Sequence, residues 1–196
     1  MRQILMSTLL LLLGWPTAAR AEWQLRPSVG LALGGATTFP DTELAAGKVH
    51  TIFSVSGALI GDVLGLEADF GRASGFFQQS PGNHTVARSN VTTLTGNITV
   101  ALPRRFSEYT LRPYFVGGGG LMHLRADNFV PSLSISDDAA SVDLGGGVTG
   151  FFTRRIGVNW DIRHFRTVRG NGDGSVDVVG GRLSFWRANM ALAIRY

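Results

Sequence analysis

Four histidines are the side chains best suited to proton transfer near neutral pH, and they stand at positions 50, 84, 123 and 164. A histidine beside a serine or an acidic residue could serve as the general base of a catalytic triad. His84 lies next to Thr85 in a predicted long loop, and His50 and His123 lie near the ends of predicted strands. No histidine–serine spacing typical of such a triad is present. We therefore expect the histidines to be polar rim or lumen residues, and we predict no catalytic set.

Metal and cofactor chemistry has little support in the sequence. The stretch from Asn171 to Asp177 superficially resembles a calcium loop, but with Asp173 at position five the register puts Arg169 at position one and Gly180 at position twelve. The glycines at 117–120 are followed by no lysine and no predicted helix, unlike a phosphate-binding loop. The chain has no cysteine, which excludes disulfides and thiolate ligands. We expect no metal and no cofactor.

A set of charged residues of both signs alternates with apolar residues along the predicted strands. The other positions on the same face of each strand are mainly glycine, alanine, serine and threonine, so these charges share one face with small residues. Unpaired charges are costly in a low-dielectric interior, which predicts that they pair. The predicted interior polar network comprises Arg26, Glu67, Asp69, Asp143, Asp161, Arg163, Arg187 and Arg195.

The composition indicates one domain with an unusually apolar surface. The 196 residues are 44% hydrophobic and only 16% charged, and they include 26 glycines. The formal net charge of +4 includes Arg2 and Arg20 of the amino-terminal segment, so 18 − 2 = 16 basic residues face 14 acidic ones in the remainder. This near balance argues against a nucleic-acid partner.

The first 21 residues have the three parts of an export signal. A basic residue, Arg2, precedes the apolar run from Ile4 to Trp15, which is too short to span a bilayer as a helix. The small-residue pattern Ala19-Arg20-Ala21 follows, and we place cleavage after Ala21, with Ala19 as the alternative. We therefore predict a cleaved signal peptide over 1–21 and a single domain over 22–196.

From Trp23 onward the apolar residues recur with a period of two, which predicts strands. The sequence divides into eight such segments, near 23–34, 49–60, 65–76, 90–102, 111–125, 140–152, 156–166 and 186–196. In the segment near 111–125, Tyr114, Val116, Met122 and Leu124 are placed on the apolar face, opposite His123 and Arg125. Short connections (61–65, 103–110 and 153–155) alternate with longer ones (38–48, 77–89, 126–139 and 167–181).

This alternation is typical of an all-β, eight-stranded antiparallel up-and-down transmembrane β-barrel. The strands are long enough to cross a bilayer when tilted, and the small and charged face fits the filled interior of an eight-stranded barrel. The apolar face then meets lipid. An even number of strands puts both termini on the short-turn, periplasmic side.

Several stretches resemble a known family. The carboxyl-terminal residues 190–196 end on an aromatic residue, with apolar residues at alternate positions before it. They resemble the signal by which the barrel-assembly machinery recognises its clients, which implies an assembly role for Met190, Leu192, Ile194 and Tyr196. Residues 66–71, 112–119 and 157–166 resemble strands of the OmpA-type, OmpX-like small outer-membrane β-barrels. The resemblance covers the whole mature chain and implies a location in the bacterial outer membrane.

Members of that family have different activities, so the resemblance implies no single function. We favour an integral outer-membrane protein with a structural or surface-interaction role and no catalysis. The alternatives are a barrel enzyme that modifies lipid A, and a narrow pore. We expect a monomer that contacts outer-membrane lipid and lipopolysaccharide. Arg104, Arg105, Arg154 and Arg155 fall in short turns, whereas the predicted long loops hold acidic residues that could share divalent cations with lipopolysaccharide: Asp41, Glu43, Asp127, Asp137, Asp138, Asp173 and Asp177.

Overall fold

The computed structural model describes residues 21–37, 49–74, 86–106, 111–128, 135–168 and 183–196, so residues 1–20 of the predicted signal lie outside it. The described chain forms eight strands: β1 (Glu22–Thr37), β2 (His50–Ile60), β3 (Leu64–Ser74), β4 (Val86–Ala101), β5 (Leu111–Asn128), β6 (Ile135–Phe151), β7 (Ile156–Thr167) and β8 (Leu183–Arg195). One 3-10 helix, η1 (Arg104–Phe106), lies between β4 and β5. Among the described residues, no helix is long and apolar enough to cross a membrane.

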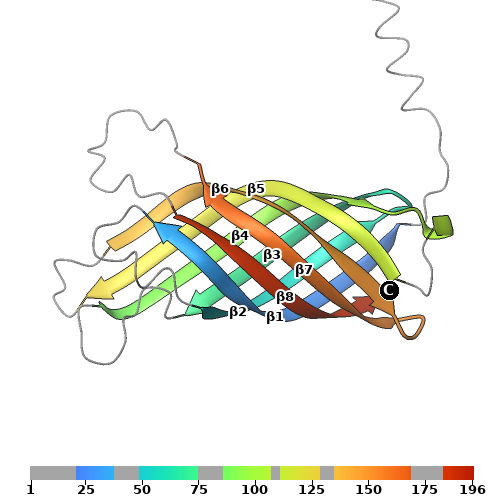
Figure 1. Ribbon diagram of the computed structural model, residues 1–196, viewed down its shortest axis with the longest axis horizontal. Helices are drawn as coiled ribbons and strands as arrows, with labels where there is room; N and C mark the ends of the chain where they lie inside the picture. Colours follow the sequence, from blue (N-terminus) through green and yellow to red (C-terminus); the bar gives the residue numbers. More distant parts are fainter. Residues whose placement is uncertain (1–20, 38–48, 75–85, 107–110, 129–134, 169–182) are drawn as a thin grey trace, which may run out of the picture.

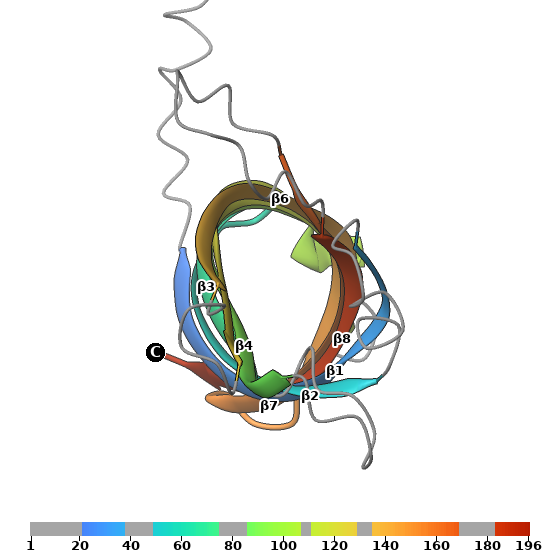
Figure 2. The same cartoon turned by 90° about the vertical axis from the view of Figure 1, so that its left-hand side faces the viewer.

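Each strand pairs antiparallel with the next one along the chain, and β1 pairs with β8 (Figures 1 and 2). The strands therefore form a closed, tilted barrel with no free edge. Closure also joins the start of β1 to the carboxyl-terminal residue, because the Tyr196 amide donates to the Trp23 carbonyl at 3.0 Å. The predicted eight-stranded up-and-down barrel is confirmed.

The two ends of the barrel differ. At one end, here called the turn end, lie the start of β1, the end of β8 and the connecting residues 61–63, 102–106 and 152–155 (right side of Figure 1). At the opposite end, here called the loop end, lie the end of β1 and the start of β8. β5 and β6 continue further toward the loop end than predicted, because their ladder extends to Ala126 and Ile135. Asp127 therefore lies in β5, and Asp137 and Asp138 lie in β6, not in a loop as predicted.

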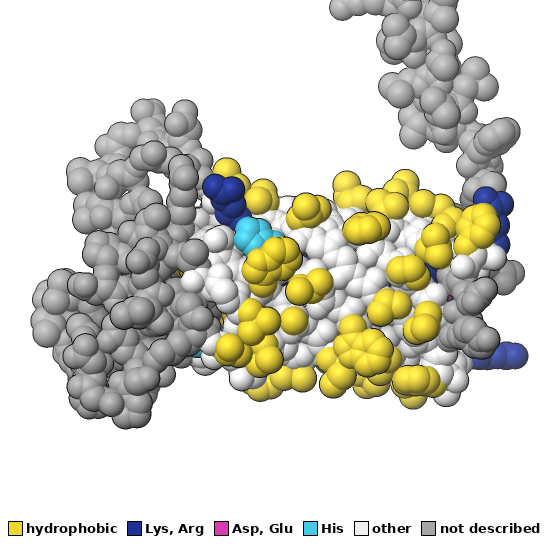
Figure 3. All heavy atoms as spheres, in the orientation of Figure 1, with side chains coloured by type: hydrophobic (Ala, Val, Ile, Leu, Met, Phe, Trp, Pro, Cys, Tyr) yellow, Lys and Arg dark blue, Asp and Glu magenta, His cyan; other side chains and the backbone are white. Residues whose placement is uncertain are grey.

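The outer wall of the barrel is apolar, as expected for a wall that faces lipid (Figure 3). Leu66 is 61% exposed, Ile98 59% and Leu144 71%, which are unusual values for leucine and isoleucine in mid-strand. Aromatic side chains gather on this wall toward the turn end: Trp23, Phe106, Phe115, Phe152 and Tyr196. Aromatic girdles of this kind mark the level of the membrane–water interface.

The prediction for the β5 faces was wrong. Tyr114, Val116, Met122 and Leu124 are at most 4% exposed and point inward, whereas Phe115 and Leu121 point outward. Both faces of β5 carry large apolar residues. The four glycines at 117–120 have no side chains, so they do not distinguish the inward face from the outward face. Pairing with β4 decides the matter, because outward Leu94 lies opposite Leu121 and inward Thr93 lies opposite Met122.

Candidate functional site

The structure places seven of the eight residues predicted for the interior network inside the barrel. We call these seven the lumen network: Arg26, Glu67, Asp69, Asp143, Asp161, Arg163 and Arg187. The side chains of Arg26, Arg163 and Arg187 are at most 2% exposed, which is rare for charged residues without partners. The eighth residue, Arg195, lies at the turn end with its side chain 25% exposed, and its Nη1 pairs with Glu22 Oε1 at 3.0 Å.

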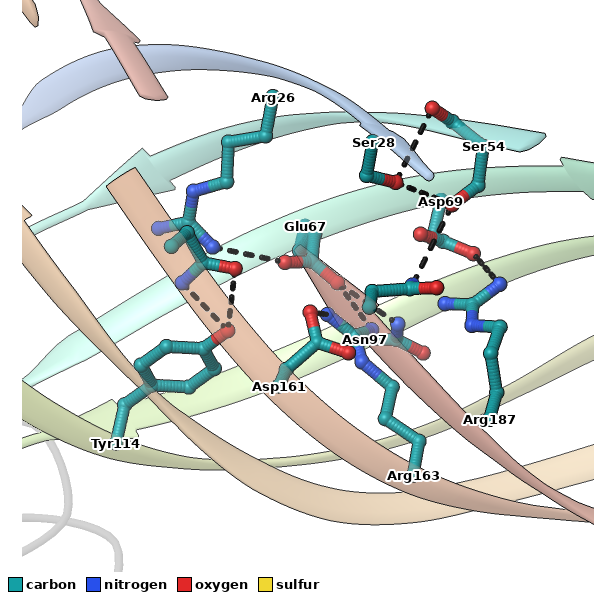
Figure 4. Close-up of polar contacts among 12 residues, drawn as sticks. Arg26, Ser28, Ser54, Glu67, Asp69, Asn97, Tyr114, Asp161, Arg163 and Arg187 are labelled. Carbon is teal, nitrogen blue, oxygen red and sulfur yellow. Dashed lines mark hydrogen bonds and ion pairs between the residues drawn. The ribbon is translucent and has the colours of Figure 1, made fainter. Parts of the chain in front are cut away.

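Glu67 is the centre of the lumen network (Figure 4). Its fully buried carboxylate accepts from Arg163 Nη1 at 2.5 Å and from Arg26 Nη1 at 3.2 Å. Asn97 Nδ2 donates to the same carboxylate at 3.2 Å. These donors come from β7, β1 and β4, so one side chain of β3 connects strands on opposite sides of the barrel. Charge-assisted hydrogen bonds of this kind compensate for the cost of burying the carboxylate.

Arg163 and Arg187 lie beside the remaining carboxylates. Arg163 Nη2 donates to Asp161 Oδ2 at 3.3 Å, and its Nη1 lies 3.8 Å from Asp143 Oδ2. Arg187 Nη1 pairs with Asp69 Oδ1 at 2.8 Å, and its guanidinium lies 4.6 Å from the ring centre of Phe165. Three guanidiniums therefore face four carboxyl groups, and the lumen network carries no excess of positive charge.

Uncharged polar residues complete the network, and sequence reasoning did not single them out. Gln24 Oε1 accepts from Arg26 Nη2 at 2.6 Å and from its Nε at 3.1 Å. Tyr114 and Asn159 bond to each other, and Asn159 Nδ2 also donates to Thr149 Oγ1 at 2.8 Å. Their inward position in the two-residue alternation was the available signal for Gln24, Asn97 and Asn159. It failed for Tyr114, because the faces of β5 were assigned the wrong way round.

Two apolar layers enclose the lumen network. On the loop-end side the buried layer consists of Ala32, Ile52, Ala73, Val91, Met122, Leu124, Phe165, Leu183 and Phe185, in which Phe165 and Phe185 stack with ring centres 5.3 Å apart. On the turn-end side the layer consists of Ala58, Ile60, Ala101, Tyr114 and Val116. The network is thus a set of internal ion pairs between two dry layers. This arrangement links strands on opposite sides of the barrel through ion pairs and hydrogen bonds.

The family model of the outer membrane protein beta-barrel domain matches residues 7–185. The chain belongs to this family. This outer-membrane barrel is similar in fold to neisserial surface protein A (11% identity, TM-score 0.60, 89% of this chain and 97% of that one) and to the amino-terminal barrel of Pseudomonas aeruginosa OprF (13%, 0.54, 91% and 99%). It is also similar to Yersinia pestis Ail in complex with the heparin analogue sucrose octasulfate (10%, 0.51, 88% and 99%). No curated protein sequence matches the chain.

The described histidines of the outer-membrane barrel do not form one cluster. His50 is buried and belongs to the inward-facing positions of β2. His164 packs against Trp186 with ring centres 4.9 Å apart, and His123 Nδ1 lies 2.7 Å from Asp138 Oδ1 on the outer wall. His84 lies outside the described residues. The same is true of the stretch from Asn171 to Asp177, and no group of metal-binding side chains occurs among the residues that are described.

Charged and histidine side chains appear on the outer wall where the apolar surface ends, near the loop end (left side of Figure 3). They occupy outward positions of β3, β5 and β7, one or two alternations beyond the last large apolar residue of each strand. We call them the basic girdle: Arg72, His123, Arg125, His164 and Arg166. Asp138 is the acidic residue beside it. Sequence reasoning placed His123 and Arg125 on the inward face, so it missed this girdle.

The predicted assembly residues lie along the outer wall of β8. Met190 is 52% exposed, Leu192 46% and Tyr196 81%. Ile194 lies on the same face, opposite Ile156 of β7. All four side chains are therefore on the surface of the finished barrel, where a role in recognition does not conflict with packing.

Proposed function

We propose that this outer-membrane barrel is a non-catalytic protein whose loop end contacts lipopolysaccharide. The basic girdle is the observation that carries the proposal. It puts three arginines on the outer wall next to the apolar band, where the phosphates of an outer-leaflet glycolipid lie. Arginine binds phosphate through paired, charge-assisted hydrogen bonds.

The orientation that the proposal requires follows from the sequence. With the predicted signal peptide removed and both termini on the periplasmic side, the loop end faces outward, as in bacterial barrels generally. The complex of Ail with a sulfated sugar supports contact between this kind of barrel and anionic saccharides. A role for divalent cations bridged by loop acids remains part of the proposal, although Asp41, Glu43, Asp173 and Asp177 lie outside the described residues.

The test compares the mature chain in phospholipid vesicles with and without lipopolysaccharide. We expect lipopolysaccharide to raise the unfolding temperature of the wild type, and a variant with Arg72, Arg125 and Arg166 all changed to Gln to lose most of that increase. The control variant changes Arg105 and Arg155, which lie in the turns, to Gln. The proposal fails if the girdle variant keeps the full increase, or if lipopolysaccharide does not affect the wild type.

A second candidate function, modification of lipid A, is favoured by one specific contact. His123 Nδ1 lies 2.7 Å from Asp138 Oδ1 on the wall that faces lipid, and Thr92 of β4 is the cross-strand partner of His123. A histidine oriented by a carboxylate is the arrangement of a general base. Mass spectra of lipid A from cells with the wild-type gene, with His123→Ala and without the gene test it. A modification lost in both altered strains establishes the enzyme, and identical spectra in all three contradict it.

A further inference from the structure

A cavity of about 600 Å³ opens at the turn end of the barrel, on the opposite side from the basic girdle. Its walls come from the turn-end parts of β1, β2, β4, β5, β6 and β8, from η1 and from the turn between β6 and β7. Ile60, Ala101 and Tyr114 of the turn-end apolar layer contribute to its lining, so the cavity ends against that layer. The deep part of the lining thus combines these residues with the buried polar side chains of Gln24 and Thr149, and charged residues surround the mouth.

The charge of the mouth is strongly one-sided. Among the described residues that line the cavity are four arginines, namely Arg104, Arg112, Arg154 and Arg195, and one acidic residue, Glu22. The net formal charge of the lining is thus 4 − 1 = +3. This contrasts with the lumen network above it, where carboxyl groups outnumber guanidiniums. The excess of positive charge is thus a property of the cavity mouth and not of the whole barrel interior.

Three of these guanidiniums are held in place by the protein. Arg195 Nε donates to the Arg154 carbonyl at 2.8 Å, and its guanidinium lies 4.4 Å from the ring centre of Phe151. Arg112 Nη2 donates to the carbonyls of Gly61 and Asp62 at 2.8 and 2.7 Å. Arg104 Nη2 pairs with Glu22 Oε1 at 2.7 Å, the same oxygen that Arg195 binds. An anion that enters finds these donors already oriented, which reduces the cost of binding.

Arg154 differs from the other three. Its side chain is exposed and makes no hydrogen bond or ion pair with any described residue, although its carbonyl holds Arg195. It is therefore a donor group at the mouth that is available to a ligand.

We propose that the turn-end cavity binds a phosphate-bearing molecule, with the phosphate held by Arg104, Arg154 and Arg195 and the carbon part lying toward Ile60 and Tyr114. A phosphate matches the excess of three positive charges better than a single carboxylate does, and guanidinium groups bind it in bidentate geometry. Two sources carry this chemistry: a soluble phosphate ester, and the head group of a phospholipid from the adjoining leaflet. The proposal does not depend on lipopolysaccharide binding, which concerns the other end.

The chain offers matched controls, because each of two turns contains a pair of adjacent arginines. Arg104 and Arg154 line the cavity, whereas Arg105 and Arg155 do not. Arg105 instead lies over Phe106, with its guanidinium 4.7 Å from the ring centre. All four are exposed, so Gln at each position removes one charge from the same end of the barrel with little effect on packing.

The experiment titrates the full mature chain, folded in maltoside micelles, with inorganic phosphate, glycerol 3-phosphate and dihexanoyl phosphatidylglycerol, and follows binding by calorimetry. We expect saturable binding of at least one phosphate ester, weakened about tenfold by Arg104→Gln or Arg154→Gln, or about 1.4 kcal/mol. Arg105→Gln and Arg155→Gln should change the affinity less than twofold. Heat-modifiable gel mobility checks that each variant is folded.

The titrations also distinguish the two sources. Equal affinities for glycerol 3-phosphate and the short-chain lipid indicate a soluble ester, and binding of the lipid alone indicates a head group; either result supports the proposal if the arginine pairs differ as expected. Absence of saturable binding for all three compounds overturns it. Equal weakening by all four variants also overturns it, because that result would reflect general surface charge and not a site.

Discussion

Glu67 receives donors from three other strands, whereas Asp143 of the same network receives none from the described residues. Both Asp143 carboxylate oxygens are buried without a hydrogen-bond donor, and the nearest cation, Arg163 Nη1, is 3.8 Å away. The two carboxyl groups therefore share a lumen but differ in how well their burial is compensated. Removing the charge of Glu67 should therefore destabilise the barrel more than removing the charge of Asp143.

We predict that Glu67→Gln destabilises the barrel by about 3 kcal/mol or more, because Arg26 and Arg163 then retain buried charges without their shared partner. Asp143→Asn should cost less than half as much, since it removes a poorly compensated charge. Guanidinium unfolding in phospholipid vesicles, followed by tryptophan fluorescence, measures both variants. A larger loss for Asp143→Asn would show that Glu67 is not the centre of the network.

Gly118 and Gly96 provide a second matched pair, on the two sides of the β4–β5 wall. A Cβ on Gly118 would point inward, 2.7 Å from Asn97 Cα and still closer to the Gly96 carbonyl oxygen, whereas a Cβ on Gly96 would meet nothing within 4 Å. We predict that Gly118→Ala destabilises the barrel by about 1–3 kcal/mol through overpacking. Gly96→Ala should be neutral or slightly stabilising. The same unfolding assay compares them, and equal effects would contradict the close approach of β4 and β5.

At the scale of the strand, the sequence predicted the inward and outward faces correctly where only one face carried large apolar residues. β1 is such a strand: Leu25 faces outward as predicted, and Arg26 faces inward. β5 is not, because its inward residues build the two apolar layers while its outward residues meet lipid. Alternation reports which residues share a face but not which face is inside, so β5 could be assigned only from its partners.

The ends of the strands were also difficult to predict, for a related reason. Backbone pairing of β5 with β6 continues past Leu124 to Ala126 and Ile135, so Asp137 and Asp138 lie in the paired part of β6. Hydrophobic pattern detects the part of a strand that lies in the bilayer, whereas hydrogen bonding determines where the strand ends. The interior network was more accessible to prediction, since buried charges at inward positions must find partners. Which partners they find depends on strand stagger, which the sequence does not reveal.

The last strand allows assembly to be separated from stability. The Tyr196 side chain is 81% exposed, and the hydrogen bond to Trp23 uses only its backbone amide. We predict that Tyr196→Ala markedly lowers the amount of folded protein in cells, while the thermal unfolding of protein refolded in vitro stays close to wild type. Phe152→Ala, another exposed turn-end aromatic at 76%, is the control. If both variants accumulate equally, the terminal residue is not a recognition signal.

At the scale of the whole molecule, the stacked interior predicts how the barrel behaves toward ions. The lumen network is enclosed by apolar layers on both sides, and eight strands leave little space once side chains fill the interior. We predict no stable conductance steps in planar bilayers, with an outer-membrane porin as the positive control and boiled protein as the negative one. Reproducible conductance steps that increase in number with added protein would contradict this prediction and support the narrow pore as the function.

The ion pair between Arg163 and Glu67 joins residues 96 positions apart in the sequence, and Arg26, from the first strand, reaches the same carboxylate. No hairpin contains all three groups, so a partly assembled sheet would leave charges without partners. Such contacts between distant parts of the chain are slow to form, because the intervening chain must first be brought together. The network can therefore distinguish a closed barrel from an unfinished one. In a barrel whose first and last strands have not paired, the interior stays hydrated, and a hydrated interior does not fit a lipid environment. Pairing of β1 with β8 would then exclude water from the interior in a single cooperative step.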